Sequence, residues 1–146
     1  MLFRSVDAVV VGHFRDAALN TAAVGVDEAT GGVLTRLIET EDITGKQGEL
    51  TTLLAPAGMA TATLVVVGLG KQEDLNRGAA LRAVAAAAKS LAKKERAQVA
   101  FYVGDGWSND LVEAAICGAT IGCEGQDLYR AEKSLHPFGE IGRAHV

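Results

Sequence analysis

The run Ala62-Thr63-Leu64-Val65-Val66-Val67-Gly68-Leu69-Gly70 decides the fold of this chain. It is almost continuously apolar and rich in valine, and such a run predicts a strand that is buried on both faces. A second run of the same kind, Asp7-Ala8-Val9-Val10-Val11-Gly12, lies near the start of the sequence. Two buried strands that each end in glycine indicate the central sheet of an α/β protein.

The segments around these runs fit the same architecture. Four strands are predicted, at residues 5–14, 50–55, 61–69 and 98–103. Apolar residues spaced three or four apart predict helices over residues 24–38, from Asp74 to about residue 94, and 108–122. The pair Gly31-Gly32 lies inside the first of these helices, where close packing against the sheet would explain it. Strands that alternate with helices predict one layered domain with right-handed crossovers.

Composition excludes several classes of protein. With 49% apolar and 22% charged residues in 146, the chain has the usage of a globular domain and not of a disordered one. The net charge of −4 argues against non-specific binding to nucleic acid. No apolar run approaches the roughly 20 residues of a membrane span, and Asp7 interrupts the start before a signal-like stretch develops. We therefore expect a cytoplasmic protein.

Two glycine motifs suggest nucleotide binding but are incomplete. Gly68-Leu69-Gly70 follows a strand, as in the dinucleotide fingerprint, but the third glycine of that motif is replaced by Glu73, whose charge would repel a pyrophosphate. Gly45-Lys46 resembles the end of a phosphate loop, but Gln47 stands where Ser or Thr is required and Thr40 replaces the first glycine. A glycine turn that leaves a strand explains the first motif better.

No catalytic residue and no metal ligand is predicted in this chain. None of the histidines has a Glu-x-x-His or Cys-x-x-Cys companion, and the carboxylates lie in polar helix ends and loops, where solvated or capping roles are common. The histidines are His13, His136 and His145. We expect His13 at the rim of the sheet. Cys117 and Cys123 lie in one helix, cannot form a disulfide there, and are expected to be buried free thiols.

Several segments, taken in order, resemble the N-terminal domain of the leucyl aminopeptidase family, the cytosolic two-metal exopeptidases. The resemblance covers almost the whole chain. Its segments are the valine run at residues 7–12, the helix that carries Gly31-Gly32-Val33-Leu34, Asp42-Ile43-Thr44-Gly45-Lys46-Gln47-Gly48, Val65-Val66-Val67-Gly68-Leu69-Gly70-Lys71, the Ala-rich helix, and a last helix that runs into Gly122-Cys123-Glu124-Gly125-Gln126-Asp127-Leu128-Tyr129.

This resemblance implies a macrodomain-like fold, a mixed β-sheet sandwiched between helices, that forms the non-catalytic lobe of a hexameric peptidase. In the family, the two divalent ions (Mn or Zn), the catalytic lysine and the assisting arginine belong to the C-terminal domain. The family signature Asn-Thr-Asp-Ala-Glu-Gly-Arg is absent from this sequence. The resemblance therefore implies that this lobe serves packing, oligomer assembly and access to the catalytic chamber, while peptides are substrates of the whole enzyme.

The resemblance also suggests that the chain is a truncated aminopeptidase. We expect residues 1–140 to be the N-terminal domain and residues 141–146 to be a non-native tail. The tail, Ile141-Gly142-Arg143-Ala144-His145-Val146, has no structural logic after Pro137-Phe138-Gly139-Glu140 and reads like a translated sequencing adapter. We therefore leave the tail out of the fold prediction.

Two alternatives remain open. The first is a free-standing macrodomain-like module that binds ADP-ribose or a related nucleotide, with Gly68, Gly70 and Gly104 near the diphosphate; the acidic neighbours Glu73 and Asp105 count against it. The second is binding to nucleic acid, for which the only support is a basic cluster near the end of the Ala-rich helix; a solvated helix face is the commoner meaning of such charges. The cluster is Lys89, Lys93, Lys94 and Arg96.

Overall fold

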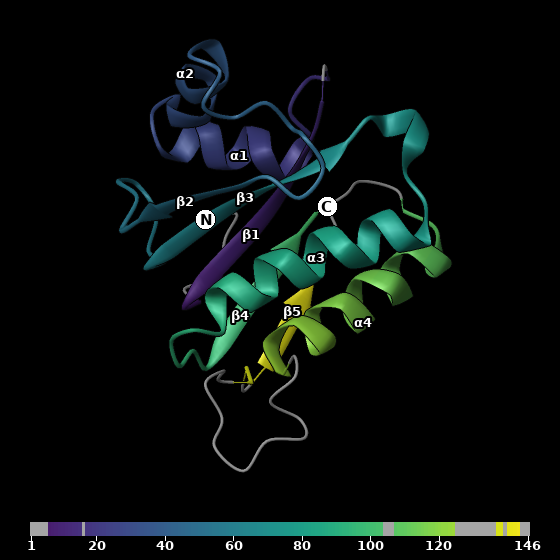
Figure 1. The fold of residues 1–146 in the computed structure, drawn as a ribbon. Coiled ribbons are helices and arrows are strands. Elements are labelled where there is room, and N and C mark those ends of the chain that lie inside the picture. Colours follow the sequence, from purple (N-terminus) through teal and green to yellow (C-terminus); the bar gives the residue numbers. More distant parts are fainter. Residues whose placement is uncertain (1–5, 16, 104–106, 125–136, 139, 144–146) are drawn as a thin grey trace.

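The computed structural model describes residues 6–15, 17–103, 107–124, 137–138 and 140–143. They form a five-stranded sheet in the order β2-β3-β1-β4-β5, shown in Figure 1. β2 is antiparallel to β3, and the other neighbours are parallel, so the sheet is mixed as predicted. The strands are β1 (Ala8–Phe14), β2 (Leu50–Leu54), β3 (Thr63–Gly70), β4 (Gln98–Tyr102) and β5 (Glu140–Arg143).

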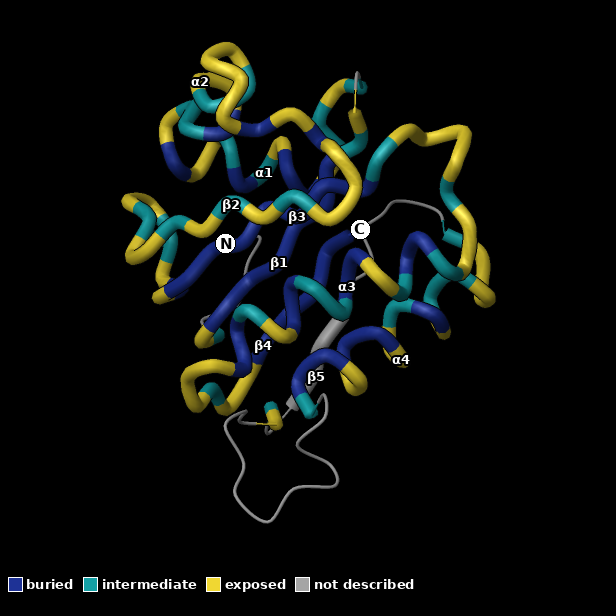
Figure 2. Tube along the Cα trace, viewed as in Figure 1, coloured by how far each residue is buried: buried dark blue, intermediate teal, exposed yellow. Residues whose placement is uncertain are grey.

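Helices cover both faces of this sheet, which confirms the predicted sandwich (Figure 1). Alternate residues of β1 point to opposite sides because side chains of a strand alternate. Val9 and Val11 pack with the helices α1 (Thr21–Ala29) and α2 (Val33–Glu39). Ala8 and Val10 belong to the core that the sheet shares with α3 (Arg77–Leu91) and α4 (Asn109–Glu124). The central strands are buried almost throughout, as Figure 2 shows.

The predicted helix over residues 24–38 is wrong in one respect, because the structure divides it into α1 and α2. Gly31 and Gly32 have φ angles of 74° and 87°, a left-handed conformation that ends one helix and redirects the chain into the next. Asp27 of α1 joins the two helices, since its carboxylate accepts hydrogen bonds from the backbone N–H (3.0 Å) and the hydroxyl (2.5 Å) of Thr35. The glycine pair is therefore a turn and not a packing contact inside a helix.

The start of α3 also differs from the prediction. Asp74 belongs to a short 3-10 turn, Gln72–Asp74, and Asn76 is the N-cap of α3, with its side-chain oxygen accepting from the N–H of Ala79 at 2.9 Å. Asn is as good an N-cap as Asp, and the hydrogen bond to the third following residue is the usual one. The helix therefore begins two residues later than its acidic neighbour suggests.

The helices α3 and α4 pack against each other through glycine. A Cβ atom at Gly118 would lie 2.5 Å from the carbonyl oxygen of Leu81, and one at Gly122 would lie 2.4 Å from that of Ala85. The two glycines of α4 therefore let it approach α3 very closely within this chain.

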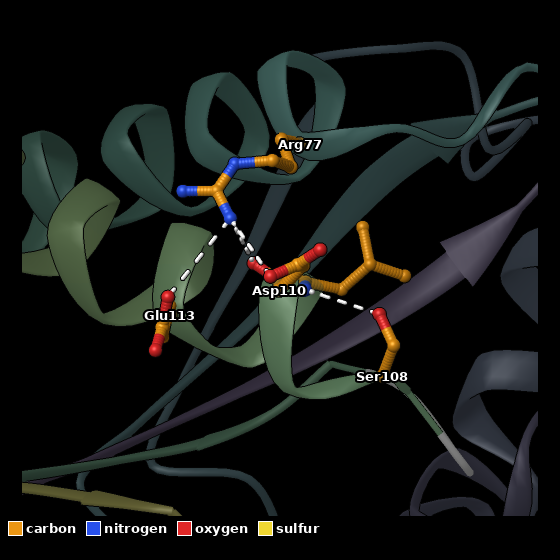
Figure 3. Close-up of polar contacts among 5 residues, drawn as sticks. Arg77, Ser108, Asp110 and Glu113 are labelled. Carbon is orange, nitrogen blue, oxygen red and sulfur yellow. Dashed lines mark hydrogen bonds and ion pairs between the residues drawn. The ribbon is translucent and has the colours of Figure 1, made fainter.

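Polar contacts join the first turns of the same two helices (Figure 3). Arg77 forms an ion pair with Asp110 at 3.3 Å and lies 3.9 Å from a carboxylate oxygen of Glu113. Ser108 accepts a hydrogen bond from the N–H of Leu111 at 3.4 Å, which agrees with the predicted start of α4. The side chains of Arg77, Asp110 and Glu113 are more than half exposed, so these ion pairs stabilise the helix pair only weakly.

One expectation about the later part of the chain needs correction. Cys123 is buried as predicted, but Cys117 is exposed on α4. The backbone of residues 141–143, which were left out of the predicted fold, belongs to β5 and pairs in parallel with β4 from Val99 to Phe101. No helix among the described residues is long and apolar enough to cross a membrane.

Candidate functional site

The carboxyl ends of β1 and β3 meet at one edge of the sheet, where open α/β sheets usually bind their ligands. His13 pairs with Gly68 and Phe14 with Gly70, with a register shift between the two pairs. The loop of residues 44–48 lies on this edge, since Gly45 comes so close to β1 that a Cβ atom there would be 2.6 Å from the nitrogen of Arg15. This edge, with its two glycines and its overlying loop, is the candidate site.

The backbone groups of both candidate glycines are already hydrogen-bonded at this edge. Gly68 donates its N–H to the carbonyl of Glu49 (2.7 Å), and Gly70 donates to the carbonyl of Gly45 (2.8 Å). The carbonyl of Gly68 accepts from Gly48, and that of Gly70 accepts from Arg15. A diphosphate bound here would need free N–H donors. In this structure the donors of Gly68 and Gly70 hold the loop instead.

Steric contact explains why glycine is needed at position 68. A Cβ atom on Gly68 would lie 1.9 Å from the carbonyl oxygen of Lys46. Gly45 and Gly48, with φ angles of 82° and 81°, let the loop turn tightly enough to reach the strand. The sequence indicates the glycines at the end of β3 but not this partner. The signal that was available is the pair of loop glycines three residues apart.

His13 lies inside the protein and not at the rim that the sequence predicts. The residue is 4% exposed, and its Nδ1 atom is buried without a hydrogen-bond partner among the described residues. Burial lowers the pKa of His13 below its ordinary value, an effect that the nearby negative charge of Glu49 partly opposes. Burial therefore favours the neutral form of the imidazole. His136 and His145 lie outside the described residues.

Glu49 fastens the loop through its side chain. One carboxylate oxygen accepts from the backbone N–H groups of Thr44 (2.8 Å) and Gly45 (3.2 Å), and the other accepts from the Thr44 hydroxyl (2.6 Å). Partial burial raises the pKa of Glu49, but these hydrogen bonds and the proximity of His13 outweigh it, so its pKa lies below the ordinary value. The carboxylate is thus a structural acceptor, and its hydrogen bonds order the loop over the strand ends.

The remaining candidate residues are not brought together here. Glu73 is exposed in the 3-10 turn, and Gly104 and Asp105 lie outside the described residues. No group of three His, Cys, Asp or Glu side chains that could hold a metal occurs in the described part of the chain. Arg96 is set apart from the exposed lysines of the basic cluster, because it donates to the carbonyl of Leu91 (2.9 Å) and to the hydroxyl of Thr63 (3.2 Å).

Known proteins resemble this chain in sequence over most of its length. The sequence model for the N-terminal domain of the cytosol aminopeptidase family matches residues 10–133. A probable cytosol aminopeptidase of Rhodopirellula baltica is 37% identical over 114 residues, which are 78% of this chain and 22% of that protein. One of Paraburkholderia phytofirmans is 40% identical over 95 residues, 65% of this chain and 19% of that protein. The chain thus spans about a fifth of the length of these relatives.

Solved structures resemble the chain in fold. A tomato leucine aminopeptidase mutant superimposes with a TM-score of 0.73 at 21% identity, over 94% of this chain and 29% of that one. The bottromycin maturation enzyme BotP in complex with Mn superimposes with a TM-score of 0.63 at 19% identity, over 95% of this chain and 26% of that one. The macrodomain of Mycobacterium tuberculosis DarG superimposes with a TM-score of 0.66 at 11% identity, over 97% of this chain and 90% of that one. With the match over residues 10–133, the chain belongs to the cytosol aminopeptidase family, as its N-terminal domain.

Proposed function

We propose that this chain is the non-catalytic lobe of a cytoplasmic aminopeptidase, with residues 1–140 as the lobe and residues 141–146 as a non-native tail. The observation that carries the proposal is the match of the family's N-terminal domain over residues 10–133, in a chain that spans about a fifth of its relatives. The edge of the sheet agrees with a structural role, since the donors of Gly68 and Gly70 are used within the domain.

In the proposed parent protein, the C-terminal domain would bind two divalent ions, Mn or Zn, and remove N-terminal residues of the leucine type from peptides. Two such ions supply an activated water and stabilise the charge that develops on the scissile carbonyl. The related BotP enzyme was solved in complex with Mn, which supports manganese as one candidate. This lobe would pack against the catalytic domain and take part in a homo-oligomer, a hexamer by family resemblance.

The experiment that tests this proposal is to read the source DNA beyond the codon for Glu140. We expect a reading frame that continues into the family signature Asn-Thr-Asp-Ala-Glu-Gly-Arg, and a full-length product that hydrolyses leucine p-nitroanilide when manganese is added. The 146-residue chain assayed in parallel should give no hydrolysis. A stop codon soon after Glu140, or metal-dependent hydrolysis by the short chain itself, would contradict the proposal.

A second candidate is a free-standing module that binds ADP-ribose. The specific observation in its favour is the DarG macrodomain, which superimposes over 97% of this chain and 90% of its own length. The bonded N–H groups of Gly68 and Gly70 count against it. Calorimetric titration of the chain with ADP-ribose distinguishes the two candidates, because only the module should release heat on saturation.

A further inference from the structure

The strand β2 forms one edge of the sheet within the described part of the chain, where it pairs only with β3 (Figure 1). The ladder is antiparallel and runs from Leu50 opposite Val67 to Leu54 opposite Thr63. An edge strand presents a row of backbone N–H and C=O groups that another strand can use. What this edge can bind depends on which residues direct those groups outward.

The hydrogen bonds at the two ends of the ladder identify these residues. The carbonyl of Glu49 accepts from Gly68, and the N–H of Ala55 donates to Ala62, so the odd-numbered residues of β2 face β3. Because antiparallel pairs alternate, the even-numbered residues direct both backbone groups to the free edge. These are Leu50, Thr52 and Leu54. The same three residues are exposed, Leu54 to 76%, and β2 contrasts with the buried strands beside it in Figure 2.

This edge lacks the charges that usually protect an edge strand. Natural sheets discourage pairing at their edges with lysine, inward-pointing charges, bulges or proline. Here no charged residue occurs from Leu50 to Gly70, and Pro56 follows after the strand has ended. The nearest acidic group, Glu49, is engaged by Thr44 and Gly45. The surface therefore fits an uncharged, extended segment that supplies its own N–H and C=O groups.

The residues of β2 that direct their backbone groups outward also form a palindromic sequence. Leu50, Thr52 and Leu54 form the pattern Leu-x-Thr-x-Leu, and a two-fold axis brings such a pattern against itself. We propose that β2 pairs antiparallel with β2 of a second copy of this chain, centred on Thr52. Thr52 then lies opposite Thr52 of the second copy, and Leu50 opposite its Leu54.

Each facing pair in this register exchanges two backbone hydrogen bonds, because all three residues direct both groups outward. The leucines of the facing pairs lie on the same face of the joined sheet, where directly opposite apolar side chains stabilise a strand pair. The contact extends the assembly role proposed above by a specific surface. It needs only this chain, so it is tested separately from the peptidase proposal.

The test is sedimentation equilibrium of the 146-residue chain over a wide range of concentrations, because a single strand pair buries little surface and such contacts are weak. We expect a mass that rises toward that of a dimer. Thr52→Lys and Thr52→Glu each place like charges opposite one another, so the dissociation constant should rise by about tenfold or more in either variant. An equimolar mixture of the two variants should dimerise again.

Ile121→Lys is the matched control, since Ile121 is an exposed apolar residue, at 55%, on the distant helix α4. It should dimerise like the original chain. The inference is overturned if the original chain stays monomeric, if Thr52→Lys associates normally, or if Ile121→Lys is the variant that dissociates.

Amide exchange gives a second readout: protection of Leu50, Thr52 and Leu54 should rise with concentration, whereas Thr51 and Leu53 should be protected throughout. Constant protection at the three outward amides would equally overturn it.

Discussion

The backbone of Lys46 lies directly against Gly68, so that a Cβ atom at position 68 would be 1.9 Å from the Lys46 carbonyl oxygen. Hydrogen bonds reinforce this contact, since Gly68 exchanges bonds with Glu49 and Gly48. The residues are 22 positions apart in sequence, and their contact holds the loop of residues 44–48 on the sheet edge. The loop and the end of β3 thus form one unit in which a small residue is required.

Gly68→Ala should destabilise the domain by about 2 kcal/mol, because backbone atoms must shift to admit the methyl group. Urea unfolding followed by circular dichroism measures this change. Gly78→Ala is the control: Gly78 lies in the first turn of α3, and the nearest atom to an added Cβ is the flexible end of Arg82 at 3.0 Å. That substitution should be neutral or stabilise the helix by up to about 1 kcal/mol. Equal stability of the Gly68 variant and the original chain would contradict the contact.

Gly122→Ala tests the packing of α3 on α4. Alanine favours a helix by about 1 kcal/mol over glycine, so helix propensity alone predicts stabilisation. The added methyl would instead lie 2.4 Å from the carbonyl oxygen of Ala85, and we expect a net loss of about 1–3 kcal/mol. The melting temperature of the variant measures it. Thr120→Ala, at an exposed position of the same helix, should change stability by less than about 0.5 kcal/mol. A gain in stability for Gly122→Ala would refute the close packing.

The stability of the domain should fall as the solution is acidified, in two ranges of pH. The pKa of His13 is lowered in the folded state, so below about pH 6.5 the unfolded chain binds more protons than the folded one and unfolding is favoured. The pKa of Glu49 is also lowered, so its contribution is present above about pH 4.3 and is lost as the pH falls through its folded pKa. Free energies of unfolding measured by urea from about pH 8 to about pH 2 follow both ranges.

Two variants separate these ranges. His13→Gln has no titrating group at position 13, so the slope of stability against pH should become smaller as the pH falls below about 6.5, whereas the loss that comes from Glu49 should remain. Glu49→Gln removes the charge that partly opposes the lowered pKa of His13, so the loss in the upper range should become larger. Identical pH profiles for His13→Gln and the original chain would show that this histidine is not held neutral by burial.

Local sequence signals predicted the central strands well because β1 and β3 are nearly continuous apolar runs, and burial on both faces requires such runs. The burial of His13 could not be predicted in this way, because the loop near it is distant in sequence. The break between α1 and α2 was visible as Gly31-Gly32, but the apolar spacing continues across it, and spacing alone does not distinguish one helix from two. The outward groups of β2 depend on the register with β3, which the sequence does not specify.

Asp27→Ala tests the junction between α1 and α2. The Asp27 carboxylate accepts from the N–H and the hydroxyl of Thr35 near the start of α2, where Gly32 provides no side-chain cap. Removing a capping acceptor of this kind costs about 1 kcal/mol, so the unfolding midpoint in urea should fall while its slope stays the same. Glu28→Ala removes the neighbouring exposed carboxylate and should leave the midpoint nearly unchanged. If both variants lose the same stability, the loss reflects surface charge and not the cap. A loss confined to Asp27→Ala would show that this carboxylate, together with the glycine turn, holds the second helix in place over the sheet.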